Sequence, residues 1–379
     1  MSLQPRWDIF CPVVDNFGDV GVCWRLARQL AREEGIAPRL WVDDLASARR
    51  LIPSLPSNAL CHLVEGVEIR SWQTCFPLVE PGPVVIAAFA ATLPEGFLEA
   101  MAGCVPPPRW INLEYLSAED WVAGCHRLPS PHPRLPLVQH FFFPGFDRFT
   151  GGLLREGDYA WRRSAFQESV FLKAGGIPSR QPGELFISLF CYENPALQGL
   201  LSAWGQGPGR VTCLVPEGRA LPDICDFFGI SALKAGDRLT KDHLVVHVLP
   251  FVEQTRYDEL LWACDLNFVR GEDSFVRAQW AEKPFVWHIY RQEDEAHLKK
   301  LAAFLSRFCA GLDPEVRSVL QTFWVAWNQG DGQAVVASWP AFRKALAALA
   351  AHGEAWSARL QLMESLSAQL VRFCKDGIE

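Results

Sequence analysis

The sequence lacks the features that mark several large classes of protein. Its 12 cysteines form no C-x-x-C pair and show no zinc-like spacing, so neither a zinc site nor a dithiol motif is expected. No apolar run approaches the length of a membrane span, and the N-terminus has no basic-then-apolar signal. We therefore expect a reduced, cytoplasmic, soluble protein, and no residue pattern here predicts a metal or a bound cofactor.

An excess of positive charge is also absent. The chain has 36 Lys and Arg against 43 Asp and Glu, which gives a net charge of -7. This balance argues against a general nucleic-acid or membrane-surface binder. Neither G-x-G-x-x-G nor a P-loop lysine occurs, so any phosphate site has to be of another kind.

What the sequence does contain is globular and rich in aromatic residues. At 379 residues the chain is too long for a single core and long enough for two domains. Hydrophobic residues make up 49%, and the 15 Trp and 25 Phe predict aromatic cores or binding grooves.

The hydrophobic pattern of the first half alternates between buried strands and amphipathic helices. This alternation predicts a doubly wound, largely parallel α/β domain. The polar segment Asp15–Gly21 follows the first strand and opens the first helix. Strands are expected at residues 7–14, 39–42, 84–90 and 110–116, and helices at 22–34 and 93–102.

The pattern dissolves between residues 117 and 182, where prolines and glycines predict irregular structure and a linker. A second α/β unit follows, with helical sequence from Glu293 and a last helix over Glu354–Phe373. We expect domains at 1–180 and 183–350, with a terminal helix in 354–379 that returns to the first domain. In the second unit, strands are expected at 185–191, 211–215, 244–251, 266–269 and 284–289, and helices at 195–204, 221–228 and 254–264.

The stretch Phe268–Trp280 predicts the end of a strand, a tight turn and a helix start. Gly271 allows the sharp turn, and Ser274 is placed to cap the helix. Arg270 offers a planar fork of donors, and the helix start offers unpaired N–H groups, so together they suit a phosphate. Glu272 and Asp273 would repel an anion unless they face a cation or a sugar hydroxyl. A structural ion-pair cluster is the alternative interpretation.

Two such domains are expected to face each other across a cleft where ligands bind. The Asp15–Gly21 loop would lie on one wall, with Asp15 and Asp19 as candidate bases. The loops Phe190–Glu193 and Phe251–Gln254 would line the other, with aromatic rings for a base or sugar. Taken alone, Asp15 and Asp19 are more simply interpreted as residues that cap the first helix.

Two blocks of the sequence resemble the EarP family: the first strand with the residues up to Arg25, and Phe268–Arg277. The resemblance extends over essentially the whole chain. This resemblance implies a GT-B fold with two Rossmann-like domains. It also implies an inverting, metal-independent arginine rhamnosyltransferase, with dTDP-β-L-rhamnose as donor and translation elongation factor P as protein acceptor.

Residue roles follow from the same resemblance. Asp19 would be the catalytic base or orienting carboxylate, and Asp15 and Glu272 the other acidic residues needed for activity. The donor would be held by residues of both halves: Phe17, Gly18, Phe190, Tyr192, Phe251, Gln254, Arg270, Asp273 and Ser274.

Two other functions stay open. One is a GT-B transferase that uses another nucleotide sugar and a small-molecule or lipid acceptor. The other is a non-catalytic module that binds a translation factor or RNA, for which a basic stripe would be expected. The histidines His126, His132 and His140 fit no common ligand spacing and are interpreted as loop residues.

Overall fold

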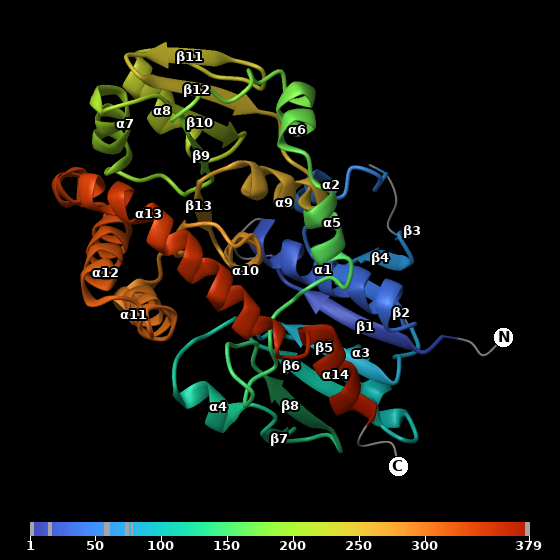
Figure 1. Ribbon diagram of the computed structural model, residues 1–379. Helices are drawn as coiled ribbons and strands as arrows, with labels where there is room; N and C mark the ends of the chain where they lie inside the picture. The colour runs from blue at the N-terminus through green and yellow to red at the C-terminus, as the bar shows by residue number, and fades with distance from the viewer. Residues whose placement is uncertain (1–3, 14–16, 57–60, 73–75, 77–78, 376–379) are drawn as a thin grey trace. The chain divides into compact units, whose positions relative to one another are not determined.

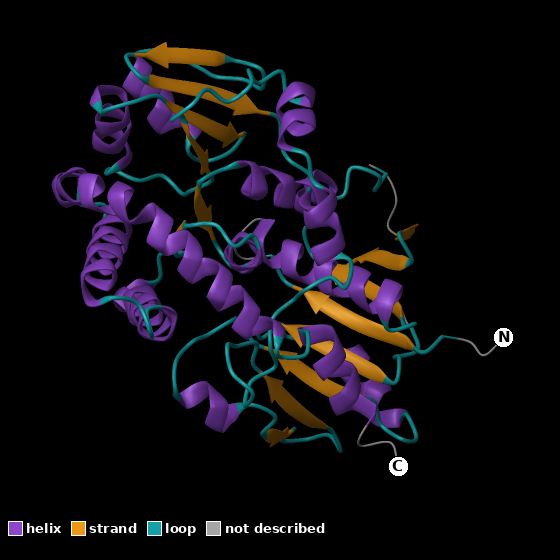
Figure 2. Cartoon of the chain, in the orientation of Figure 1, coloured by secondary structure: helices purple, strands orange, loops and turns teal. Residues whose placement is uncertain are grey.

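The computed structural model describes residues 4–13, 17–56, 61–72, 76 and 79–375, and its course is shown in Figure 1. The chain divides into two compact units, Met1–Gly157 with Leu360–Glu379, and Asp158–Arg359. In each unit, strands and helices alternate along the chain (Figure 2).

The first unit is built on a sheet whose central strands are all parallel. Five parallel pairings join β4, β2, β1, β5, β6 and β8, and β3 and β7 add antiparallel edges. The chain thus proceeds outward from β1 in one direction and then from β5 in the other, which creates a switch point between β1 and β5. In spatial order the strands are β3 (Cys61–Val64), β4 (Val67–Ser71), β2 (Ala37–Val42), β1 (Arg6–Cys11), β5 (Val84–Ala88), β6 (Arg109–Leu113), β8 (Val138–Phe142) and β7 (Pro129–Pro131).

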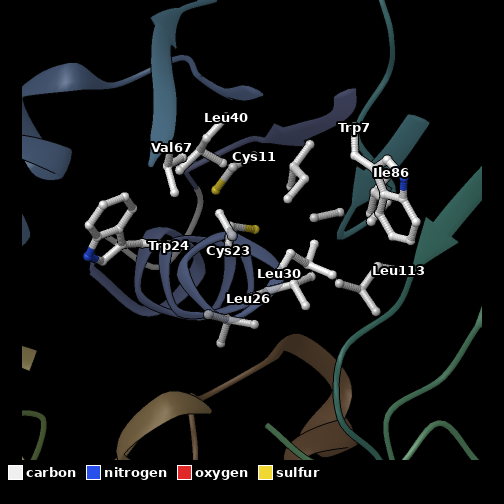
Figure 3. Close-up of a cluster of buried hydrophobic side chains, with 14 of the residues drawn as sticks. Trp7, Cys11, Cys23, Trp24, Leu26, Leu30, Leu40, Val67, Ile86 and Leu113 are labelled. Atoms are coloured by element: carbon white, nitrogen blue, oxygen red, sulfur yellow. The ribbon is translucent and has the colours of Figure 1, made fainter. Parts of the chain in front are cut away.

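Helices cover both faces of this sheet because its central strands are apolar on both sides. On one face, Leu26 and Leu30 of α1 pack in one cluster with Leu40 of β2 and Ile86 of β5 (Figure 3). On the other face, the main cluster includes residues from α3. The helices of this unit are α1 (Phe17–Glu33), α2 (Leu45–Leu51), α3 (Glu95–Gly103), α4 (Trp121–Cys125) and α14 (Leu366–Lys375).

The expectation of irregular structure over residues 117–182 was wrong. Residues Val138–Phe142 form β8, which pairs parallel with β6 from Trp110–Gln139 to Leu113–Phe142. His140 therefore lies in a strand and not in a loop. The flanking prolines hid the strand, since its partner is distant in sequence and its pairing is a tertiary effect.

The second unit repeats the parallel plan with a smaller sheet. Its parallel strands again run outward from a first strand, β9, in one direction and then from β13 in the other. The switch point therefore lies between β9 and β13. In spatial order the strands are β11 (Arg238–Lys241, antiparallel), β12 (Leu244–Leu249), β10 (Val211–Pro216), β9 (Leu185–Leu189), β13 (Leu266–Arg270) and β14 (Phe285–His288).

Aromatic rings fill much of the core of the second unit. Phe268 of β13 contacts Trp204 and Trp327 edge to face at 5.9 and 4.8 Å, and Phe275 stacks on Trp287 at 3.9 Å. The many Trp and Phe thus serve as core residues. The helices are α5 (Tyr159–Ala165), α6 (Glu168–Ala174), α7 (Leu197–Gln206), α8 (Leu221–Phe228), α9 (Gln254–Ala263), α10 (Asp273–Trp280), the short 3₁₀ turn η1 (Glu293–Glu295), α11 (Ala296–Phe308), α12 (Pro314–Gln329) and α13 (Gly332–Gln361).

Two segments differ from their expected course. The single helix expected over Glu354–Phe373 is broken between α13 and α14, because the N–H of Leu366 bonds to the carbonyl of Leu153 at 2.9 Å. Residues 158–180, placed with the first domain from the sequence, group with the second unit. Within that segment Tyr159 of α5 accepts a hydrogen bond from the Trp262 indole of α9 at 2.8 Å.

Helix α14 packs in the first unit, where Leu366 and Leu370 join the core cluster that contains α1. The described helices include none with the length and hydropathy of a membrane span.

Candidate functional site

In the second unit, predicted site residues gather at the carboxyl ends of β9 and β13, the two strands that flank the switch point. Strand β13 runs two residues past its pairing with β9, so Arg270 lies beside the chain that follows β9. Its Nη1 donates to the carbonyl of Cys191 at 3.4 Å. The topology thus places two of the predicted loops at one edge of the sheet.

The turn from β13 into α10 forms as the glycine predicts, but its serine has another role. Gly271 has a left-handed φ of 58°, which a residue with a side chain adopts only with strain. The helix cap position belongs to Glu272, and Ser274 lies inside the helix. The Ser274 hydroxyl instead accepts from the Arg270 N–H at 3.0 Å and donates to the Arg270 carbonyl. Ser274 therefore fixes the backbone of Arg270, and the predicted cap was wrong.

The Arg270 guanidinium is held against two aromatic rings. It lies 4.3 Å from the Phe190 ring centre and 4.9 Å from that of Tyr192. Such cation–π contacts orient the flat guanidinium while leaving its charge intact. The structure therefore brings together three residues predicted to bind the donor.

A network of buried ion pairs is connected to this turn. Asp258 is fully buried and accepts two bonds from Arg277, at 3.0 and 3.1 Å, and one from Arg162 at 3.0 Å. Arg277 also donates to Asp273 at 2.9 Å, and Gln254 donates to the same carboxylate oxygen at 2.9 Å. We call Arg162, Asp258, Arg277, Asp273 and Gln254 the charge relay. It joins helices α5, α9 and α10 and fixes two residues predicted to bind the donor.

Three members of the charge relay were missed by sequence reasoning. Arg277 lies four residues after Asp273, and Asp258 lies four residues after Gln254, so the helical spacing was a usable signal. Arg162 gave no signal, because it comes from a segment predicted to be irregular. The alternative interpretation of this stretch, a structural ion-pair cluster, is confirmed in part, since Asp273 pairs with Arg277.

A pocket of about 310 Å³ opens beside Tyr192 within the second unit. His288, at the end of β14, lines it and contacts the Tyr192 ring edge to face at 5.3 Å. Burial, with the charge of Arg270 second, lowers the pKa of His288 to about 3, so its imidazole is neutral at pH 7. The other polar lining side chains include Glu193, Arg219, Tyr290, Arg291 and Asn328.

Phe251 follows β12 and is half-buried. It belongs to the same carboxyl edge of the sheet, two strands away from β9. Its part in a donor site stays a prediction.

In the first unit, Asp19 lies in the first turn of α1, the helix that follows β1. Asp19 is the third residue of the helix and only 2% exposed, so it is not the residue that caps it. Burial, the Cys23 thiol and the charge of Asp19 raise the pKa of Cys11, the last residue of β1. Asp15 lies outside the described residues.

Phe17 and Gly18 open α1 and are half-buried. The Arg50 guanidinium of α2 lies 5.2 Å from the centre of the Phe17 ring. This contact fixes the ring beside the start of the helix.

Comparison with known proteins gives one consistent result. A model of the family described as Elongation-Factor P (EF-P) rhamnosyltransferase EarP matches residues 7–375. A protein-arginine rhamnosyltransferase of Pseudomonas aeruginosa is 49% identical, with 98% of this chain and 99% of that protein covered.

Solved structures agree. One that presents the structural basis for EarP-mediated arginine glycosylation of translation elongation factor EF-P is 36% identical, with a TM-score of 0.70 and coverage of 99% of this chain and 100% of that chain. A structure of TcCGT1 in complex with UDP has a TM-score of 0.52 at 10% identity, with 98% and 99% covered, and shows the fold alone.

The two parallel α/β units and these likenesses define a glycosyltransferase of the GT-B class. Within that class, the family model and the relatives leave a single assignment. The chain belongs to the EarP family of EF-P rhamnosyltransferases.

Proposed function

We propose that this protein transfers L-rhamnose from dTDP-β-L-rhamnose to an arginine side chain of elongation factor P, with inversion at the anomeric carbon and without a metal. Family membership supports the acceptor and the sugar. The single structural observation behind the donor assignment is the Arg270 guanidinium held over Phe190 and Tyr192 at the β13–α10 turn.

The second unit binds the donor. Arg270 and the N–H groups at the start of α10 take the diphosphate, since both present positive charge to an anion. Phe190 and Phe251 take the thymine, and Tyr192 borders a pocket of about 310 Å³, a volume in the range of small-ligand sites. Gln254, Asp273 and Ser274 complete the donor site, with Gln254 and Asp273 held by the charge relay.

The first unit handles the acceptor. A guanidinium is protonated in water, with a pKa above roughly 12, and a protonated guanidinium has no free lone pair. Carboxylates orient such a cation by paired hydrogen bonds. Asp19 and Asp15 hold the group so that one nitrogen faces the anomeric carbon. Glu272, which belongs to the second unit, is the other acidic residue needed for activity.

The transfer balances without a further reactant. A bond forms between a guanidinium nitrogen and the anomeric carbon, and the bond between that carbon and the diphosphate oxygen breaks. The electron pair of the broken bond leaves with dTDP, and the nitrogen gives its proton to Asp19. Arg270 stabilises the leaving diphosphate, the task a metal ion performs in many other transferases. Attack opposite the leaving group gives an α-linked rhamnose.

Intact-mass spectrometry tests the proposal. Purified protein, elongation factor P and dTDP-rhamnose, in buffer with EDTA, should give a factor heavier by one deoxyhexose. An acceptor whose target arginine is changed to lysine is the matched control and should keep its mass. An unmodified factor under saturating donor would refute the proposal, and a product formed only after metal is added would refute its metal-free form.

A further inference from the structure

The first unit has a strained turn at its own switch point. The turn directly follows β5, the strand that pairs with β1 at that point. Phe89 and Ala90 follow β5 directly and both have left-handed φ angles, 55° and 56°. Neither is glycine, so both residues carry backbone strain that the surrounding structure has to hold. In the second unit the corresponding position, after β13, is the Gly271 turn of the predicted donor site.

Bonds on both sides of the turn hold this strained conformation. The Phe89 N–H donates to the Leu113 carbonyl at the end of β6 at 2.7 Å, and the Ala91 N–H donates to the Ala88 carbonyl at 3.0 Å. The Phe89 ring stacks on Tyr115, with ring centres 4.3 Å apart and planes 18° apart. The turn thus places the Phe89 ring in contact with Tyr115 at the carboxyl edge of the sheet.

A carboxylate stands next to that pair in the chain. Glu114 follows β6, its N–H donates to the Phe142 carbonyl at 2.9 Å, and its side chain accepts from Asn112 Nδ2 at 2.7 Å. Asn112 is 4% exposed, and within the described part of the chain its Oδ1 has no hydrogen-bond partner. Leaving the Asn112 oxygen buried without a partner costs free energy. The other end of the same amide holds the Glu114 carboxyl group in place.

The aromatic pair and Asp19 both lie at the carboxyl edge of the first sheet, because Asp19 opens the helix that follows β1 and the two rings follow β5 and β6. Phe89 and Tyr115 pack in the same cluster as Cys11 and as Val20, the residue after Asp19 on α1. The ends of β1, β5 and β6 are adjacent in the sheet, since β5 pairs with both β1 and β6. Asp19, the aromatic pair and Glu114 therefore occupy one edge of the first unit.

We propose that Glu114 and the Phe89–Tyr115 pair form the subsite that binds the acceptor guanidinium. This inference rests on the proposed transfer to arginine and names the residues that receive that side chain. A guanidinium is flat, carries its charge over three nitrogens, stacks on aromatic faces and pairs with a carboxylate through two parallel bonds. A lysine ammonium is a point charge that uses neither the fork nor the stack, so the subsite favours arginine.

Steady-state kinetics with elongation factor P as the varied substrate, at saturating dTDP-rhamnose, test the subsite. Glu114→Gln and Tyr115→Leu should each raise the acceptor KM by about tenfold, the loss expected for one charged hydrogen bond or one stacked cation. Donor affinity, measured by calorimetry on the same preparations, should stay at the wild-type value. Glu99→Gln, an exposed carboxylate of α3, is the matched control and should change neither quantity.

The outcomes separate the two claims. Wild-type protein that leaves the factor unmodified would overturn the proposed function and this subsite with it. Wild-type transfer together with an unchanged acceptor KM in both variants would overturn the subsite alone. A parallel loss of donor affinity in Glu114→Gln and Tyr115→Leu would also overturn it, because a general structural defect would then explain the change. If Glu114→Gln proves insoluble, Tyr115→Leu decides the matter with the same measurements.

Discussion

The two switch points use the same topology but opposite charge. In the second unit, an arginine lies over aromatic rings and a buried chain of ion pairs stands behind it. In the first unit, a nearly buried aspartate lies at the start of α1, and a strained turn follows β5 at the same edge of the sheet. One site is suited to an anion and the other to a cation. The comparison teaches that one doubly wound plan supplies either kind of site, depending on which residues follow its central strands.

The largest expected effect comes from removing the carboxylate of the first unit. Asp19→Asn keeps the shape of the side chain but removes a proton acceptor, so turnover should fall by roughly 10²- to 10⁴-fold. Initial rates of rhamnosylation under saturating substrates measure it. Asp43→Asn is the control, because Asp43 lies at the same edge and bonds the Val13 N–H at 2.9 Å, a bond that an asparagine oxygen still accepts. Turnover of Asp19→Asn close to wild type would remove Asp19 from the chemistry.

The next effect concerns the charge relay of the second unit. Arg277→Met leaves the buried Asp258 short of a partner and should reduce the free energy of unfolding by about 3–5 kcal/mol. The double variant Arg277→Met/Asp258→Leu removes both charges and should recover most of that stability. Donor affinity should stay about tenfold weaker in the double variant, because Asp273 has lost one of the two bonds that orient it.

Urea unfolding and calorimetry on the same preparations check this pair of results. Arg256→Met is the matched control, since Arg256 lies on α9 in an exposed pair with Glu259 and such pairs contribute little. A double variant with wild-type donor affinity would show that the relay serves stability alone.

The smallest effect is a pH dependence from His288. Its pKa is lowered to about 3 in the folded protein, while the unfolded imidazole protonates near its ordinary value of about 6.5. Between these values the unfolded state binds more protons, so stability falls as the pH is lowered from about 6.5 toward 3. Between pH 7 and pH 5, His288 should account for about 1 to 2 kcal/mol of lost unfolding free energy.

Unfolding curves at the two pH values, for wild type and His288→Gln, measure this contribution as a difference. His288→Gln should lose less stability than wild type on acidification. His243→Gln, an exposed histidine of the same unit, should behave as wild type. Equal losses in all three proteins would show that the His288 imidazole titrates alike in the folded and unfolded states.

The parts of the fold that were predictable depend on local sequence. The turn after β13 follows from an apolar run, a glycine and a polar start to α10, and the left-handed Gly271 confirms it. Strand β8 escaped prediction because prolines flank it and its parallel partner β6 lies far back in the sequence. The break before α14 escaped for a similar reason, since it depends on the bond between Leu366 and Leu153.

The same limit applies to the site. Arg270, Phe190 and Tyr192 were predicted to line one site, and the structure places them in contact. Their part in binding a donor stays a prediction. The role predicted for Ser274 was wrong. Whether its hydroxyl caps the helix or bonds back to Arg270 depends on backbone angles that no residue pattern specifies. Asp258 was missed because its partners, Arg162 and Arg277, lie on two other helices, α5 and α10.

Calorimetric titration of dTDP-rhamnose into two variants tests the central division of labour most directly. Asp19→Asn should bind the donor as wild type does, since it alters only the acceptor side. Arg270→Ala should bind at least about tenfold more weakly, since it removes the charged bonds to the diphosphate. Comparable losses of donor affinity in both variants, or a loss confined to Asp19→Asn, would contradict this account.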